Sequence, residues 1–153
     1  MPPPRHHGSG QWRVAVFSAT LWVAAVPALA ASQEAHRLNE GAVALASQGR
    51  YEEAAALFTQ ALRLSPGDEV IRRNLAGVRT VLGHQYLHSG SLLQAQYQYQ
   101  AALELVPEES AALLGLGDIQ HRNRQPRLAA EFYRRAVAAE PTNPYAYARL
   151  AQA

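Results

Sequence analysis

From Ser32 onward, apolar and alanine residues recur every three or four positions, and short stretches rich in Gly, Pro, Asn and Ser interrupt them. This spacing places the recurring residues on one face of an α-helix, and the interruptions are typical of turns. The segment QAQYQYQ, residues 94–100, alternates as a strand would, but it continues into AALELV without a turn signal. The pattern therefore predicts an all-α chain with short connections.

Three segments of the chain end alike. Pro66, Pro107 and Pro141 each follow an alanine by twelve residues, an aromatic residue by eight and a second alanine by five. The residues at these positions are Ala54, Phe58 and Ala61; Ala95, Tyr99 and Ala102; and Ala129, Tyr133 and Ala136. The last two prolines are 34 residues apart and the first two are 41 apart. Recurrence at such a period is typical of a solenoid of stacked helical units.

This repeat resembles the tetratricopeptide repeat (TPR) family, whose unit is a pair of helices about 34 residues long. Gly83 and Gly117 stand where the family needs a small residue so that the paired helices can approach, and Ala42 and Ala151 match in the first and last units. The resemblance covers nearly all of residues 35–153. It implies a right-handed superhelix of antiparallel helix pairs, with three units and a partial fourth.

The turns within the units also match, with one departure. Gly49 and Gly90 occupy the turn between paired helices, whereas the third unit has Arg124 there and opens its second helix with Pro126. Proline is well tolerated in the first turn of a helix. We expect Asn123 to take the left-handed conformation in place of the missing glycine.

The resemblance also sets the unit boundaries. The domain is expected over 31–153, with units at about 35–68, 76–109 and 110–143 and the partial unit at 144–153. Residues 69–75, EVIRRNL, are extra. Seven residues make about two helical turns, so this insertion should lengthen the following helix without rotating its apolar face. We predict one helix from about Asp68 to His88, with Asp68 as its cap.

The N-terminal 30 residues have the pattern of a secretory signal. Residues 1–13 are basic and rich in turn formers, 14–31 carry no charge, and Ala28-Leu29-Ala30 offers small residues for cleavage after Ala30. The alternative is an uncleaved inner-membrane anchor, because the apolar run is near the lower limit for a spanning helix. Either way the repeats are expected outside the cytoplasm, most simply in the periplasm. Ser32 stands where a lipoprotein would need cysteine.

Composition excludes several kinds of chemistry. The chain has no cysteine and no lysine, which excludes disulfides, thiolate chemistry and lysine Schiff bases. Without the leader, twelve arginines balance twelve acidic residues. Nucleic-acid binding needs a dense basic surface, so nucleic acid is not an expected partner. No phosphate loop, dinucleotide fingerprint or nucleophile elbow is present, and no cofactor is expected.

Two histidines, His84 and His88, are four residues apart in GHQYLHSG and so lie on one face of a helix. Zinc proteases use this spacing, but HQYLH lacks the glutamate that follows their first histidine. The favoured interpretation is two histidines that line a groove. The alternative is a periplasmic metal-binding protein in which His121 completes the site with them.

The TPR resemblance implies that the first helix of each unit lines a concave groove that holds a peptide or a partner helix. By repeat position, the expected lining is Asn39, Val43, Thr80, His84, Leu87, His88, Leu114, Asp118, His121 and Arg122. Members that grip a terminal carboxylate do so from positions held here by Asn39, Val43, Val81, Ala111 and Gly115. Only Asn39 among these is polar, so that clamp is not expected.

The sequence therefore predicts an exported, non-catalytic scaffold or adaptor whose partner is another protein. The resemblance to periplasmic members suggests envelope assembly, secretion, pilus or polysaccharide export. The chain could instead be the N-terminal interaction module of a longer enzyme or outer-membrane protein. Membrane contact is expected only through an uncleaved leader.

Overall fold

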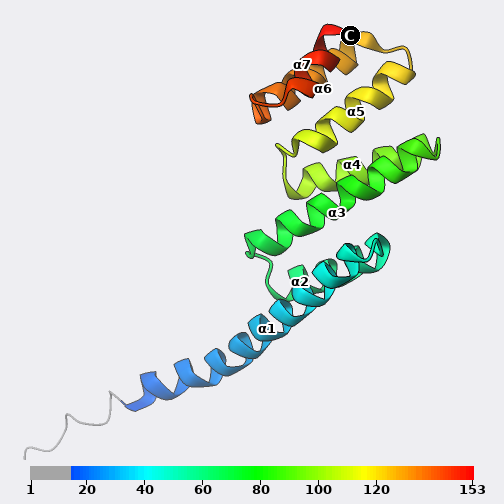
Figure 1. The fold of residues 1–153 in the computed structure, drawn as a ribbon. Helices are drawn as coiled ribbons and strands as arrows, with labels where there is room; N and C mark the ends of the chain where they lie inside the picture. Colours follow the sequence, from blue (N-terminus) through cyan, green and yellow to red (C-terminus); the bar gives the residue numbers. More distant parts are fainter. Residues whose placement is uncertain (1–14) are drawn as a thin grey trace, which may run out of the picture.

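The chain folds into stacked pairs of antiparallel helices, as the periodicity predicts. The computed structural model describes the backbone of residues 15–153 and the side chains of residues 28–153. These residues form seven helices and no strand: α1 Ala15–Ser47, α2 Tyr51–Leu64, α3 Glu69–His88, α4 Leu92–Leu105, α5 Ser110–Arg122, α6 Pro126–Ala139 and α7 Pro144–Ala151. Figure 1 shows α1 with α2, α3 with α4 and α5 with α6 as successive layers, and α7 packs on α6. The predicted all-helical solenoid is confirmed.

The repeated alanine–aromatic–alanine triads form the interior of the stack. Their nine residues, on α2, α4 and α6, are each at most 1% exposed. Each triad packs against the first helix of its own unit and the first helix of the next, so that three core clusters follow one another along the solenoid. Small alanines let neighbouring helices approach, and the aromatic ring fills the space between them.

Residues 69–75, EVIRRNL, form the first turns of α3. The Asp68 carboxylate accepts hydrogen bonds from the backbone N–H groups of Val70 and Ile71, at 2.9 and 3.1 Å, and so caps the helix. Ile71 and Leu75 are 2% and 4% exposed and pack in the first core cluster. These turns therefore contribute apolar contacts to the first helix pair.

The turns inside the three pairs share one geometry. Gly49 and Gly90 have φ of +77° and +81°, and Arg124 has φ of +58°. The expectation that Asn123 would be the left-handed residue is wrong, because its φ is −76°. Arg124 lies at the position of the two glycines and makes the same backbone bond, from its N–H to a carbonyl three residues earlier. The backbone hydrogen bonds that end the helix in this kind of turn form only when the residue at that position is left-handed.

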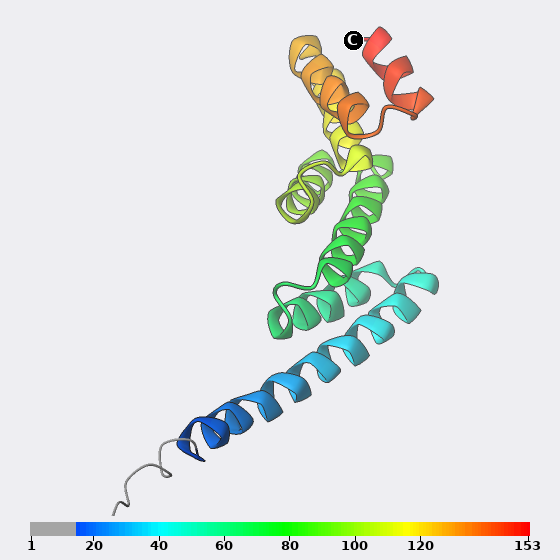
Figure 2. The same cartoon turned by 90° about the vertical axis from the view of Figure 1, so that its left-hand side faces the viewer.

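Helix α1 extends far beyond its partner α2 in both views (Figure 1, Figure 2). Its 33 residues correspond to about 50 Å. The helix runs through Ala28, Leu29 and Ala30 without a break, and these three residues are exposed. The predicted basic segment 1–13 lies outside the described residues. In the part of the chain open to this test, no helix combines the length and the hydropathy needed to cross a membrane.

Candidate functional site

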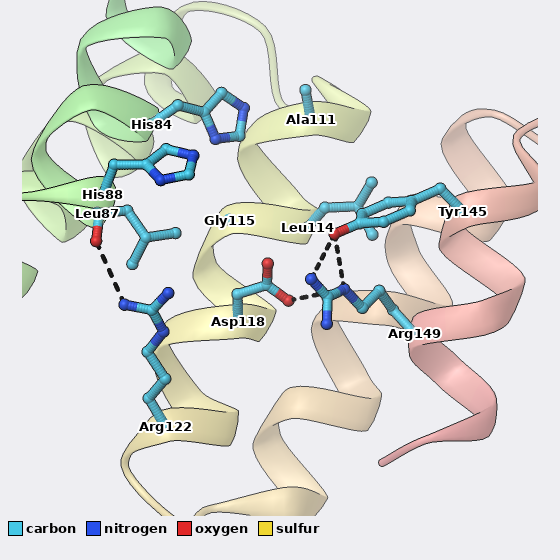
Figure 3. A pocket seen from close by; sticks show the side chains of 10 residues that line it. All are labelled: His84, Leu87, His88, Ala111, Leu114, Gly115, Asp118, Arg122, Tyr145 and Arg149. Carbon is cyan, nitrogen blue, oxygen red and sulfur yellow. Dashed lines mark hydrogen bonds and ion pairs between the residues drawn. The ribbon is translucent and has the colours of Figure 1, made fainter.

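A pocket opens on the face formed by the first helices of the second, third and fourth units. Its cavity is about 340 Å³, and α3, α5 and α7 line it. In Figure 3, His84 and His88 of α3 face Tyr145 and Arg149 of α7 across residues of α5. The complete lining is His84, Leu87, His88, Ala111, Leu114, Gly115, Asp118, Arg122, Tyr145 and Arg149.

The structure brings most of the predicted groove residues together, but not all of them. His84, Leu87, His88, Leu114, Asp118 and Arg122 line the pocket. Asn39 and Val43 lie on α1, outside this pocket, and the Asn39 side chain accepts a hydrogen bond of 3.0 Å from Asn74. Thr80 is 4% exposed, and its hydroxyl donates to the Ala76 carbonyl at 3.0 Å, which turns it away from a ligand. His121 is exposed but does not line the pocket.

His84 is held from beneath by a core tyrosine. The Tyr99 hydroxyl and His84 Nδ1 are 2.8 Å apart, and the two rings meet edge to face. Burial lowers the pKa of His84, an effect that the nearby Asp118 carboxylate partly opposes, while burial raises the pKa of Tyr99 well above its usual range. The imidazole is therefore neutral near pH 7 and the phenol keeps its proton.

In the next unit, Asp118 is held in the same way by the core tyrosine of that unit. The Tyr133 hydroxyl donates to Asp118 Oδ1 at 2.8 Å, and Arg149 Nε lies 3.3 Å from the same oxygen. The Arg149 guanidinium also stacks on the Tyr145 ring, 4.8 Å from its centroid, and donates to the Tyr145 hydroxyl. Asp118, Arg149 and Tyr145 thus form one connected group that joins α5 to α7 (Figure 3).

Glycines let the two tyrosines reach the groove. A Cβ on Gly83 would lie 2.5 Å from the Tyr99 ring, one on Gly115 would lie 2.2 Å from it, and one on Gly117 would lie 2.3 Å from the Tyr133 ring. The sequence predicts the close approach at Gly83 and Gly117 and misses it at Gly115. Side chains at these positions would close the gaps through which the hydroxyls pass.

The same pairing recurs at a separation of fifteen residues. Tyr99 contacts His84 and Tyr133 contacts Asp118, each fifteen positions earlier. In the first unit the aromatic residue is Phe58, which has no hydroxyl, and the residue fifteen positions earlier is Val43. A buried hydroxyl needs a partner and a phenyl ring does not, so the groove is polar where the core has tyrosine.

Two lining residues, Tyr145 and Arg149, are not among those that the sequence predicts. They lie 34 positions after Ala111 and Gly115, so they occupy the equivalent places of the fourth unit. The 34-residue period was the signal that could have found them. The segment PYAYARLAQA is short and largely apolar, which makes its two groove positions hard to recognise.

The alternative of a metal site gains no support from the geometry. Among the described residues, no group of three or more His, Cys, Asp or Glu side chains is placed to hold a metal ion. His121 does not line the pocket that His84 and His88 line, and Nδ1 of His84 faces the Tyr99 hydroxyl. The predicted ligand set is therefore not assembled.

Two family models match the chain, and both describe the tetratricopeptide repeat. One covers residues 45–84 and the other covers residues 80–144. Together they cover residues 45–144, from the last residues of α1 to the start of α7. The protein is built of tetratricopeptide repeats.

The similar solved structures are TPR domains too. The first TPR of Spaghetti (RPAP3) bound to the HSP90 peptide SRMEEVD has a TM-score of 0.51 and 24% identity, over 79% of this chain and 90% of that one. The Arabidopsis OM64 TPR domain has a TM-score of 0.53 and 19% identity, over 80% and 95%. The second TPR domain of human RPAP3, in complex with the HSP70 peptide SGPTIEEVD, has a TM-score of 0.52 and 18% identity, over 80% and 96%. These likenesses support the fold of the TPR array.

The curated relatives are much longer bacterial proteins. Cellulose synthase operon protein C of Komagataeibacter xylinus is 27% identical over 58% of this chain and 8% of its own length. The protein of the same name from Komagataeibacter sucrofermentans is 27% identical over 56% and 7%. The TPR chain thus spans less than a tenth of the relatives that it matches. TPR domains typically mediate protein–protein interaction.

Proposed function

We propose that this TPR protein is a scaffold or adaptor that binds a segment of a partner protein on its concave face. The bound segment is an extended peptide or a helix. The observation that carries the proposal is the pocket between α3, α5 and α7, which lies on the first helices of successive units and combines apolar with polar lining residues. Leu87, Leu114 and Tyr145 offer apolar contacts, and Asp118 and Arg122 offer polar ones.

Binding without catalysis is the activity that this lining supports best. The ten lining residues include no serine, threonine, cysteine or lysine, which leaves two histidines, Asp118 and Tyr145 as the side chains with nucleophilic atoms. Asp118 accepts a hydrogen bond from the Tyr133 hydroxyl and pairs with Arg149, so its carboxylate is already engaged by two neighbouring side chains. The pocket groups are thus arranged to hold a ligand in place.

We place this activity outside the cytoplasm, in the export of a polysaccharide or in another envelope machine. Two observations support this: the leader has the three parts of a secretory signal, and the curated relatives are named for a cellulose synthase operon. Intact-mass measurement on protein recovered from the periplasm tests the export. We expect a chain that begins at Ala31, and a chain that keeps residues 1–30 would contradict cleavage there.

Affinity capture from envelope extracts tests the groove. Ala111→Phe places a large side chain in the pocket from a partly exposed position, so it should block the groove while the fold persists. Ala56→Phe makes the same substitution on the exposed face of α2 and is the matched control. We expect the wild type and Ala56→Phe to recover the same partner and Ala111→Phe to lose it. Equal recovery by both variants would refute binding in the groove.

A further inference from the structure

The charged groups of the pocket are unequally satisfied. Asp118 is the one carboxylate among the ten lining residues, and Tyr133 and Arg149 already contact it, at 2.8 and 3.3 Å. Arg149 is thereby neutralised and also donates to Tyr145. The α7 side of the pocket is therefore an internally balanced group that needs no ligand.

Arg122, on the opposite side, is a cation without an acidic partner. Its Nη1 donates to the Leu87 carbonyl at 3.2 Å, in the last turn of α3. Within the described residues, no carboxylate lies within ion-pair distance of its guanidinium. A guanidinium has several further N–H donors in a planar fork that matches a carboxylate. The donors that the Leu87 carbonyl does not use remain for a bound molecule.

The Tyr99 hydroxyl pairs with Nδ1 of His84, and the tautomer of the ring sets which of the two atoms donates. The equivalent Tyr133 donates to a carboxylate that can only accept, and Tyr99 stands in the same position relative to His84 Nδ1. With Nδ1 as the acceptor, the proton of the neutral ring is on Nε2. His84 thus presents a donor to the pocket, beside the imidazole of the exposed His88.

We infer that this side of the pocket receives the carboxylate of an aspartate or glutamate within the bound segment, held by Arg122 and His84 with His88 beside them. The inference rests on the proposed function, since it assigns one residue of the segment that the groove binds. Leu87 and Leu114 pack against the aliphatic part of that residue and its neighbours. The free N–H donors of the lining need an acceptor, and the net positive charge of the lining residues favours an anionic acceptor.

An internal residue of the segment fits better than its terminal carboxylate. The polar contacts lie in the second to fourth units, and the concave side continues along α1, where Val43 is 48% exposed. A segment that lies along the groove would pass the pocket and continue toward α1. Ala111 and Gly115, which line the middle of the pocket, provide no side-chain donor for a chain end.

Selection from random peptide libraries on the immobilised full-length protein tests the inference. One library displays peptides fused at both ends and the other displays them with a free C-terminus. The protein variants are the wild type, Arg122→Gln, Arg63→Gln and the groove-blocking Ala111→Phe. Arg63→Gln removes one positive charge from the exposed face of α2 and is the control for net charge.

We expect the wild type and Arg63→Gln to enrich doubly fused peptides with Asp or Glu at one position. Arg122→Gln should lose this preference. A selected peptide and its Glu→Gln or Asp→Asn version should differ by about tenfold or more in Kd, because a hydrogen bond to a charged group contributes about 1.5–3 kcal/mol. His84→Gln, made as a single substitution, should weaken the preference for an acidic residue relative to the wild type and leave helical content unchanged.

Four results would overturn the inference. Enrichment without an acidic position, or an equal acidic preference in Arg122→Gln, would show that Arg122 holds no carboxylate while leaving groove binding intact. An acidic preference confined to the free-ended library would assign the pocket to a chain terminus. If Ala111→Phe enriches the same peptides as the wild type, the proposed function itself fails.

Discussion

Replacing Gly115 by alanine is the sharpest test of how the tyrosines are held in this TPR array. The Tyr99 ring is fully buried between α3 and α5. A Cβ on Gly115 would lie 2.2 Å from Tyr99 Cζ, whereas ordinary contacts begin near 3.4 Å. The ring would have to recede by more than 1 Å. Little room is left toward α3, because the ring already lies so close over Gly83 that a Cβ there would be 2.5 Å from it.

Two costs and one gain together set how much Gly115→Ala changes the free energy of unfolding. Overpacking a filled interior costs about 1–3 kcal/mol, and displacing the Tyr99 hydroxyl from His84 costs about 1 kcal/mol more. Alanine recovers about 1 kcal/mol of helix propensity relative to glycine. We expect Gly115→Ala to lower the free energy of unfolding by about 1–3 kcal/mol.

Gly77→Ala is the matched control, since Gly77 also lies inside a helix, α3, and a Cβ there would meet nothing within 4 Å. It should raise the free energy of unfolding by about 0.5–1 kcal/mol, because only the propensity effect remains. Urea unfolding followed by far-UV circular dichroism measures both variants. Opposite signs support the wedged ring, and equal stabilisation by both alanines would refute it. In Gly115→Ala/Tyr99→Leu the smaller side chain should relieve the overlap, so the double variant should lose less than the sum of the two single losses.

Three further substitutions test single features of the fold. Arg124→Gly should raise the free energy of unfolding by about 0.5–1 kcal/mol in urea titrations, since Arg124 has φ of +58° and a side chain costs about 1–2 kcal/mol in that region; a loss of stability would argue against the strained turn. Burial lowers the pKa of His84 below the 6.5 of an unperturbed histidine, so the unfolded chain takes up the proton first and stability should fall as the pH drops from 6.5 through the folded pKa. His84→Gln should lessen that fall in urea midpoints measured across this range, and parallel curves for the two proteins would contradict the assignment. Asp68→Ala removes both hydrogen bonds of the α3 cap and should cost about 1 kcal/mol in the same titration, whereas an unchanged midpoint would mean that the cap contributes nothing.

The sequence predicts most features that depend on local pattern, with the exception of the third turn, where Arg124 and not Asn123 is the left-handed residue. Helix α3 begins at Glu69, is capped by Asp68 and ends at His88, as the pattern predicts. The recurring triads are buried in α2, α4 and α6, and in α2 Ala55 is buried with them. Helical periodicity, caps and small-residue positions are properties of neighbouring residues in the chain, which is why they can be predicted without coordinates.

Features that depend on contacts between units were predicted less well. Thr80 was assigned to the groove by repeat position, but α3 buries it against its own Ala76 carbonyl. His121 was grouped with the other histidines, although it does not reach the pocket that they line. Arg149 completes that pocket from α7 through a pairing with Asp118 of another unit. Repeat position indicates which helix face a residue occupies, but not how far its side chain reaches across to the next helix.

The link between core and groove explains why this TPR array has its polar residues where it does. Where the core aromatic is tyrosine, its hydroxyl passes a glycine and emerges under the groove, and the residue fifteen positions earlier is His84 or Asp118. Where the core aromatic is Phe58, that earlier residue is Val43. A hydroxyl beneath the groove floor costs stability unless it is paired, so the choice of core residue restricts the residue above it. The groove side chains that contact a ligand are thus held by the same rings that pack the solenoid, which preorganises them for binding.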